Sequence, residues 1–418
     1  MDPDLRSALA TARLAQRTLA RLGAVARSAG LAAVADAVAA RRDEILAANA
    51  ADLAAATELS DALRDRLALT PARLDGVVAA VREVGDAPDP LAEERFVTTR
   101  PNGLKVYRRR IPLGVVAVIY EARPNVTVEA AALTLRSGNA VVLRGGREAA
   151  RTNAALADAV REGLRTAGLP EACVTFLRDP SRERVAELLG AAGLVDLAIP
   201  RGGPALMDFV DQHARVPVVR HGAGVCHLYI DAAADPSMAE AVAYNAKVHR
   251  PGVCNAMETL LVHRDALAET LPRIARRWRE AGVALRVDPA CADVLAAQGI
   301  PFTPAAPEDW DREFLSLVAA VRAVGSLDEA IAHIDAHGTQ HTASIVTRDA
   351  AAAERFLDRV EASCVLWNAS TRFNDGGELG LGAEMGISTS RMHAFGPMGA
   401  RELTAEKFVV RGDGQVRA

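Results

Sequence analysis

The chain has 418 residues, of which 50% are hydrophobic and 24% are charged, and its formal net charge is −4. This length exceeds one ordinary hydrophobic core and suits two or three domains. The weak charge and the 4% of aromatic residues argue against a nucleic-acid-binding protein, and no apolar run reaches the ~18 residues of a membrane span. We expect a cytoplasmic protein, because the first residues lack the apolar segment of a signal peptide.

The N-terminal part of the chain has the pattern of helices. Apolar residues recur at helical spacing through most of residues 5–85. Within this stretch, Thr70 followed by Pro71 is typical of an N-cap with proline in the first turn of a helix.

A β-hairpin is predicted next. Asn102 and Gly103 separate two strand-like runs, residues 96–100 and 104–110, and this dipeptide is the strongest short-range hairpin signal. The second run ends in three consecutive arginines, which suit an exposed edge or a subunit contact better than a core strand.

From residue 114 onward, short apolar runs alternate with helical patterns. The first four runs, each followed by a helical segment, are residues 114–120, 140–143, 174–177 and 195–199. Four such alternations predict an α/β unit with a parallel sheet. A second α/β stretch follows, with runs at residues 225–230, 259–262 and 343–346 and a C-terminal β-arm at 407–416.

Two of the predicted strand ends share an arginine and a glycine pair that open a helix. They are Arg144, Gly145 and Gly146 after one strand, and Pro200, Arg201, Gly202 and Gly203 after another. Glycine lets a backbone approach a ligand, helix N-termini favour anions, and arginine offers a fork for phosphate. The two turns together predict phosphate or nucleotide binding, with ordinary strand-to-helix turns as the alternative.

Histidine and cysteine give no sign of a metal site. His333, His337 and His341 have helical spacing, but Gly338 should end the helix between the last two, so we expect solvated or capping side chains. The five cysteines are odd in number and widely spaced, which argues against disulfides or zinc. They are Cys173, Cys226, Cys254, Cys291 and Cys364.

Cys254 has the setting of a nucleophile. It follows a helix whose end carries Lys247, His249 and Arg250, and basic neighbours favour the reactive thiolate. Backbone N–H groups after Cys254, or the side-chain amide of Asn255, would stabilise an oxyanion there. A buried structural cysteine is the alternative, and the residue chemistry alone favours neither interpretation over the other.

At this segment the sequence resembles the aldehyde dehydrogenase superfamily. The resemblance rests on several blocks in matching order, which are residues 120–127, 143–146, 199–203, 254–262, 368–373 and 376–384. It implies an aldehyde dehydrogenase-like α/β fold, with a Rossmann-type cofactor domain, an α/β catalytic domain and a small β oligomerisation flap. We expect the NADP-binding domain at residues 1–96 and 112–224, the catalytic domain at 225–388, and the flap at 97–111 and 389–418.

The resemblance also implies roles for individual residues. Cys254 would be the nucleophile, the turn at Arg144 would lie near the adenosine side of NADP, and the turn from Pro200 to Gly203 would lie near its phosphates. Arg220 stands where hydrolytic relatives have a glutamate that activates water, which suits an enzyme that must not hydrolyse its acyl intermediate.

The implied reaction is the NADPH-dependent reduction of L-glutamyl 5-phosphate to L-glutamate 5-semialdehyde in proline biosynthesis, through a Cys254 thioester and with release of phosphate. Arg123, Asn125 and Arg372 are candidates for the substrate carboxylate or phosphate, and Lys247 for lowering the thiol pKa, unless it lies at a solvated helix end. The alternatives are an acylating dehydrogenase that uses coenzyme A and a non-catalytic nucleotide-binding protein. We expect a homo-oligomer without nucleic-acid or membrane partners, and a transient contact with glutamate 5-kinase stays open.

Overall fold

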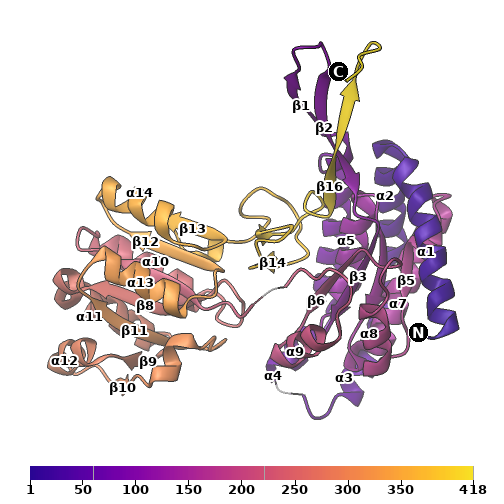
Figure 1. The fold of residues 1–418 in the computed structure, drawn as a ribbon. Coiled ribbons are helices and arrows are strands. Elements are labelled where there is room, and N and C mark those ends of the chain that lie inside the picture. The colour runs from indigo at the N-terminus through magenta and orange to yellow at the C-terminus, as the bar shows by residue number, and fades with distance from the viewer. Residues whose placement is uncertain (60, 221, 418) are drawn as a thin grey trace.

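The computed structural model describes residues 1–59, 61–220 and 222–417, which form two lobes joined by the C-terminal part of the chain (Figure 1). One lobe surrounds a four-stranded sheet and the other a seven-stranded sheet, while a three-stranded sheet projects from the first lobe. None of the helices in these ranges combines the length and the hydropathy that a membrane span needs.

The helical pattern of the N-terminal part is confirmed. It forms α1 (Pro3–Arg21), α2 (Ala24–Ala40), α3 (Arg42–Ala55), α4 (Asp61–Leu67) and α5 (Pro71–Asp86). Thr70 caps α5 as predicted, because its hydroxyl accepts a hydrogen bond from the N–H of Arg73 at 3.2 Å and Pro71 occupies the first turn.

The predicted hairpin and the C-terminal arm meet in the projecting sheet. Its strands are β1 (Glu94–Thr99), β2 (Lys105–Pro112) and β16 (Thr404–Arg411), in the order β1-β2-β16 and antiparallel. Gly103 has φ +88° in the hairpin turn, a conformation that glycine adopts without strain. The role of this sheet in oligomerisation stays a prediction.

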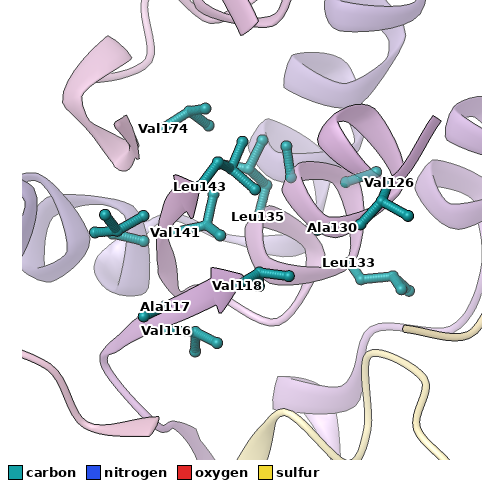
Figure 2. Packing of buried hydrophobic residues seen from close by; sticks show 14 of the residues in the cluster. Val116, Ala117, Val118, Val126, Ala130, Leu133, Leu135, Val141, Leu143 and Val174 are labelled. Atoms are coloured by element: carbon teal, nitrogen blue, oxygen red, sulfur yellow. The ribbon is translucent and has the colours of Figure 1, made fainter. Parts of the chain in front are cut away.

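The four-stranded sheet is parallel and buried, as the apolar runs predicted. It consists of β3 (Val115–Tyr120), β4 (Ala140–Arg144), β5 (Val174–Phe176) and β6 (Leu197–Arg201), in the order β5-β4-β3-β6. Its helices are α6 (Asn125–Arg136), α7 (Ala150–Thr166), α8 (Arg182–Leu189) and α9 (Pro204–His213). Figure 2 shows side chains of β3, β4 and α6 packed together in this core. The chain order reverses between β3 and β6, and ligands bind at such switch points in open α/β sheets.

The second lobe is also α/β and parallel, and its sheet has the order β10-β9-β11-β8-β7-β12-β13. The strands are β7 (Cys226–Ile230), β8 (Met257–His263), β9 (Ala284–Val287), β10 (Thr303–Pro304), β11 (Val318–Val324), β12 (Thr342–Val346) and β13 (Cys364–Trp367). The helices are α10 (Pro236–Val248), α11 (Arg264–Glu280), α12 (Pro289–Ala297), α13 (Leu327–His337) and α14 (Ala350–Arg359). Alternate residues of β7 and β8 enter separate hydrophobic clusters, so both faces of this sheet are covered.

The segment after β13 returns from the second lobe to the first. Its short strands β14 (Ile387–Ser388) and β15 (Gly396–Pro397) lie between the lobes in Figure 1. Met385 and Met398 belong to the hydrophobic core of the first lobe. The predicted boundary between catalytic domain and flap, between residues 388 and 389, falls at the end of β14.

Two of the three spaced histidines differ from expectation. Gly338 does end α13, but the side chains of His333 and His341 are only 4% and 2% exposed instead of solvated. The ring of His333 packs edge-on against His227 and Trp310, and this tertiary packing has no counterpart in the local sequence. No group of histidine, cysteine or acidic side chains in the described ranges is arranged to hold a metal ion.

Candidate active site

Cys254 lies in the turn between α10 and β8, and its side chain is exposed. The backbone of Gly224 packs against it so closely that a Cβ at Gly224 would lie 1.9 Å from the Cys254 carbonyl oxygen. The buried Cys226 thiol donates to the same oxygen at 3.1 Å. The carbonyl side of this peptide is therefore held firmly, while the thiol faces solvent.

The other four cysteines differ from Cys254 in accessibility. Cys173, Cys226 and Cys291 are buried and Cys364 is partly buried. Burial raises the pKa of Cys173 to about 12 and raises the pKa of Cys226 well above its ordinary value. These thiols stay protonated and inert near neutral pH, which leaves Cys254 as the candidate nucleophile.

The side-chain amide of Asn255 is already engaged. Its Nδ2 donates to the carbonyl oxygen of Asn374 at 2.9 Å and to that of Arg372 at 3.5 Å. The amide thus ties the nucleophile turn to residues 372–374 instead of serving as an oxyanion donor. Backbone groups are free for that task, because no acceptor in the described part of the chain is bonded to the N–H of Cys254.

Arginines from both lobes gather around the thiol. They are Arg66 in α4, Arg123 after β3, Arg201 at the end of β6, Arg250 after α10 and Arg372 near Asn255. Arg66 donates to the carbonyl oxygen of Gly252 at 3.1 Å, and none of the five forms an ion pair with a carboxylate of the described residues. Burial, and then the neighbouring Arg201, lowers the pKa of Arg123 to about 10. Such a cluster of uncompensated cations suits an anionic ligand.

The thiol pKa reflects this environment. Surrounding protein atoms displace bulk water around the exposed thiol, and this desolvation raises the pKa of Cys254. Arg201 and Arg123 lower the pKa of Cys254, whereas the carboxylates of Glu313 and Glu384 raise it. The N–H of Gly224 donates to Glu313 at 2.9 Å, which places that carboxylate beside the nucleophile turn.

Lys247 does not have either of the roles expected for it. Its side chain is fully buried, and its Nζ lies 2.5 Å from Oε2 of Glu258, which is also fully buried. The lysine therefore belongs to an internal ion pair and not to a solvated helix end. Arg201 and Arg123, instead of Lys247, are the cations that lower the pKa of the thiol.

The glycines after β4 lie close to side chains of the following segment. A Cβ at Gly145 would lie 2.1 Å from Nδ2 of Asn153, and a Cβ at Gly146 would lie 2.1 Å from Oε1 of Glu148. Arg144 closes the strand, and its guanidinium donates to the carbonyl oxygen of Pro180 while its Nε has no partner among the described residues. These residues shape the strand end at which the adenosine side of NADP is expected.

The turn after β6 leads directly into the N-terminus of α9. Gly203 is the N-cap of α9, has open space where a side chain would be, and donates its N–H to Oε2 of Glu121 at 3.0 Å. This N–H, at a helix N-terminus beside the switch point, is thus bonded to a carboxylate that a cofactor phosphate would have to displace. Pro200 lies buried within β6, and a Cβ at Gly202 would lie 2.6 Å from Cδ of Glu121.

The side chain of Arg201 points in an unexpected direction, whereas the substrate role of Asn125 stays a prediction. Arg201 packs over Gly386, where a Cβ would lie 2.6 Å from its Nη1, so it extends toward the thiol instead of the α9 N-terminus. Asn125 donates to Oε1 of Glu129 at 2.9 Å. Arg220 pairs with Asp211 at 2.9 Å.

Two substitutions should move the thiol pKa in opposite directions. Arg201→Met removes the cation that most lowers the pKa of Cys254, so the pKa rises, while Glu313→Gln removes a neighbouring negative charge, so the pKa falls. Because iodoacetamide reacts with the thiolate, the alkylation rate against pH should shift to higher pH in Arg201→Met and to lower pH in Glu313→Gln. Mass spectrometry assigns the alkylated residue, and shifts of equal sign in both variants would contradict the described environment.

Comparison with known proteins gives the family. The model of the aldehyde dehydrogenase family matches residues 2–292. A gamma-glutamyl phosphate reductase of Anaeromyxobacter sp. (strain Fw109-5) is 55% identical over 406 residues, which cover 97% of this chain and 95% of that protein. The crystal structure of gamma-glutamyl phosphate reductase from Thermotoga maritima has a TM-score of 0.95 and 41% identity, and covers 99% of this chain and 100% of that one.

A more distant solved structure shares the fold. It is an engineered glycolyl-CoA reductase with bound NADP⁺, with a TM-score of 0.69 at 17% identity, and the match covers 97% of this chain and 96% of that one. At this identity the likeness concerns the architecture alone. The chain itself belongs to the aldehyde dehydrogenase family and, within it, to the gamma-glutamyl phosphate reductases.

Proposed function

We propose that this chain reduces L-glutamyl 5-phosphate to L-glutamate 5-semialdehyde with NADPH and releases inorganic phosphate, as a step of proline biosynthesis. The observation that carries the proposal is the exposed Cys254 among arginines without carboxylate partners. The substrate is an acyl phosphate at one end and an α-carboxylate at the other, so it brings negative charge to both sides of the reacting carbon.

The first chemical step is carried by Cys254. Its thiolate attacks the acyl carbon, the C–S bond forms, and the carbonyl oxygen becomes an oxyanion that the N–H of Cys254 stabilises by about 3 kcal/mol. The oxyanion then re-forms the carbonyl, the bond to the phosphate oxygen breaks, and inorganic phosphate leaves. Arg123, Arg201 and Arg372 hold the phosphate and the α-carboxylate during this step, and a thioester remains on Sγ.

Membership of the aldehyde dehydrogenase family implies a nicotinamide cofactor, and we propose that this cofactor is NADPH. The turn of Gly202 and Gly203 would hold its pyrophosphate, and Arg144 would lie on the adenosine side, where an arginine favours the 2′-phosphate of NADP. The bound cofactor supplies the hydride that reduces the thioester carbon. Cys254 then leaves the thiohemiacetal as thiolate and the semialdehyde is released.

The projecting sheet is our candidate for subunit contacts. Phe96, Phe408 and Val410 on this sheet are more than half exposed, at 52%, 61% and 53%. Burial of these apolar side chains against a second copy would stabilise an oligomer. A transient contact with glutamate 5-kinase would protect the labile acyl phosphate.

The reverse reaction tests the proposed function. With L-glutamate 5-semialdehyde, reduction of NADP should require phosphate or arsenate, and coenzyme A should not replace them. The expected gain on addition of phosphate is at least about tenfold, because no water-activating glutamate occupies the place of Arg220. NADP should be preferred over NAD.

Two other results would each point to a different protein class. Turnover that depends on coenzyme A would favour an acylating dehydrogenase. The absence of any cysteine whose alkylation NADPH protects would favour a non-catalytic nucleotide-binding protein.

A further inference from the structure

The proposed function leaves one charged group of the substrate without a partner. L-Glutamyl 5-phosphate carries an α-ammonium group, which the arginines around Cys254 repel. A bound ammonium needs a carboxylate, because a charge left without a partner away from water is costly. The carboxylates that most raise the pKa of the Cys254 thiol are those of Glu313 and Glu384.

Glu313 already has a structural task. Its Oε1 accepts the hydrogen bond from the N–H of Gly224 that holds Gly224 against the nucleophile turn. The cations Arg66 and Lys247 also lie near enough to lower the pKa of Glu313, which burial raises. This bond gives Glu313 a structural role in the nucleophile turn, although Glu313, like Glu384, forms no ion pair with a cation of the described residues.

Glu384 is anchored at one oxygen and unpaired with any cation of the described residues. Its Oε2 accepts a hydrogen bond from the N–H of Gly376 at 2.9 Å, and a Cβ at Gly376 would lie 3.1 Å from the Cβ of Glu384. This close packing fixes the carboxylate, whose side chain is partly exposed. Asp375, the neighbouring acid, instead accepts the N–H of Gly377 at 3.0 Å and closes a turn.

Short links connect Glu384 with the nucleophile. The carbonyl oxygen of Asn374, two residues before Gly376, accepts from Nδ2 of Asn255 at 2.9 Å. From the other side, Arg201 packs over Gly386 and acts on the charges of both Cys254 and Glu384. The carboxylate is thus held beside the arginines, within the site that receives the substrate.

We propose that Glu384 binds the α-ammonium group of the substrate while the arginines bind its α-carboxylate and phosphate. The inference rests on the proposed function and makes Glu384 a specificity-determining residue. It selects amino-acid semialdehydes over chains of the same length that lack the amino group, and it has no part in bond making at Cys254.

The test compares two aldehydes in phosphate-dependent NADP reduction, L-glutamate 5-semialdehyde and 5-oxopentanoate, which lacks only the amino group. Glu384→Gln should lower kcat/KM for the amino compound by about 10- to 100-fold, mainly through KM, since a hydrogen bond between charged groups is lost. For 5-oxopentanoate kcat/KM should stay within about threefold, because no such bond exists. Any change in the thiol pKa acts on both substrates alike and cancels in their ratio.

Two further variants complete the design. Glu378→Gln removes an exposed carboxylate of the same loop, and the substrate ratio of the wild type should persist. Glu384→Asp keeps the charge on a shorter side chain, and should reduce the ratio by less than Glu384→Gln does. Urea unfolding midpoints equal to that of the wild type show that the variants are folded.

The outcomes separate this inference from the proposed function. Equal losses for both aldehydes in folded Glu384→Gln, or a wild type that does not distinguish them, would overturn the role of Glu384 alone. A wild type without phosphate-dependent turnover of either aldehyde would overturn the proposed function.

Discussion

Cys254→Ser should abolish phosphate-dependent NADP reduction with L-glutamate 5-semialdehyde. We expect kcat/KM to fall by at least about 10³-fold, because a serine hydroxyl stays protonated and cannot form the thioester that divides the reaction into two steps. NADPH binding, followed by the change in its fluorescence, should be unchanged, since the turns after β4 and β6 lie on the first lobe. Steady-state kinetics of the purified variant measure the loss.

A matched substitution controls for the loss of a sulfur atom. Cys364→Ser alters the partly buried cysteine of β13, away from the nucleophile turn, and should retain turnover close to that of the wild type. Cys254→Ser with near-normal turnover would remove the covalent mechanism. Loss of activity in both variants would mean that the effect arises from the fold and not from the nucleophile.

Local patterns in the sequence predicted most of the architecture. The apolar runs of β3, β4, β7 and β8 are confirmed as strands buried on both faces, and their alternation with helices gave the parallel sheets. The hairpin at Gly103 is confirmed because turn chemistry is also local. The aldehyde dehydrogenase-like fold is confirmed by the solved relative from Thermotoga maritima.

The surroundings of the thiol depend on contacts between distant segments and were only partly predictable. Arg66 and Glu384 lie far from Cys254 in the sequence. Arg66 stands in none of the blocks that carry the resemblance, and Glu384 ends the block 376–384, but no role was predicted for it. Arg201 was expected at the cofactor phosphates, because a residue at a strand end has a predictable position but not a predictable side-chain direction. The burial of Lys247 was not predicted for the same reason. The direction of its side chain depends on its partner Glu258, which lies on the next strand.

The buried pair of Lys247 and Glu258 links the nucleophile turn to the segment that contains Glu313 and Leu315. Lys247 is the penultimate residue of α10, and Glu258 is the second residue of β8, so the pair spans the segment that contains Cys254. The second carboxylate oxygen of Glu258 accepts the N–H of Leu315 at 3.2 Å. That bond places the segment of Glu313, which in turn holds Gly224 against the backbone of Cys254.

Loss of one partner of this pair should therefore destabilise the second lobe strongly. Glu258→Gln leaves the Lys247 ammonium fully buried without a counter-charge, and we expect a loss of about 3–5 kcal/mol in the free energy of unfolding. All three tryptophans, Trp278, Trp310 and Trp367, lie in the second lobe, so urea unfolding followed by their fluorescence reports on this lobe.

The double variant Lys247→Met with Glu258→Met distinguishes lost charge balance from lost packing. It removes both charges at similar volume and should recover most of the stability, to within about 1–2 kcal/mol of the wild type. Asp328→Asn, which breaks the exposed pairs with Arg355 and Arg359, should cost less than about 1 kcal/mol.

If Glu258→Gln were as stable as the wild type, the lysine would have to lose its proton when its partner is neutral. If the double variant were as unstable as Glu258→Gln, the hydrogen bond to Leu315 and not the ion pair would hold the turn.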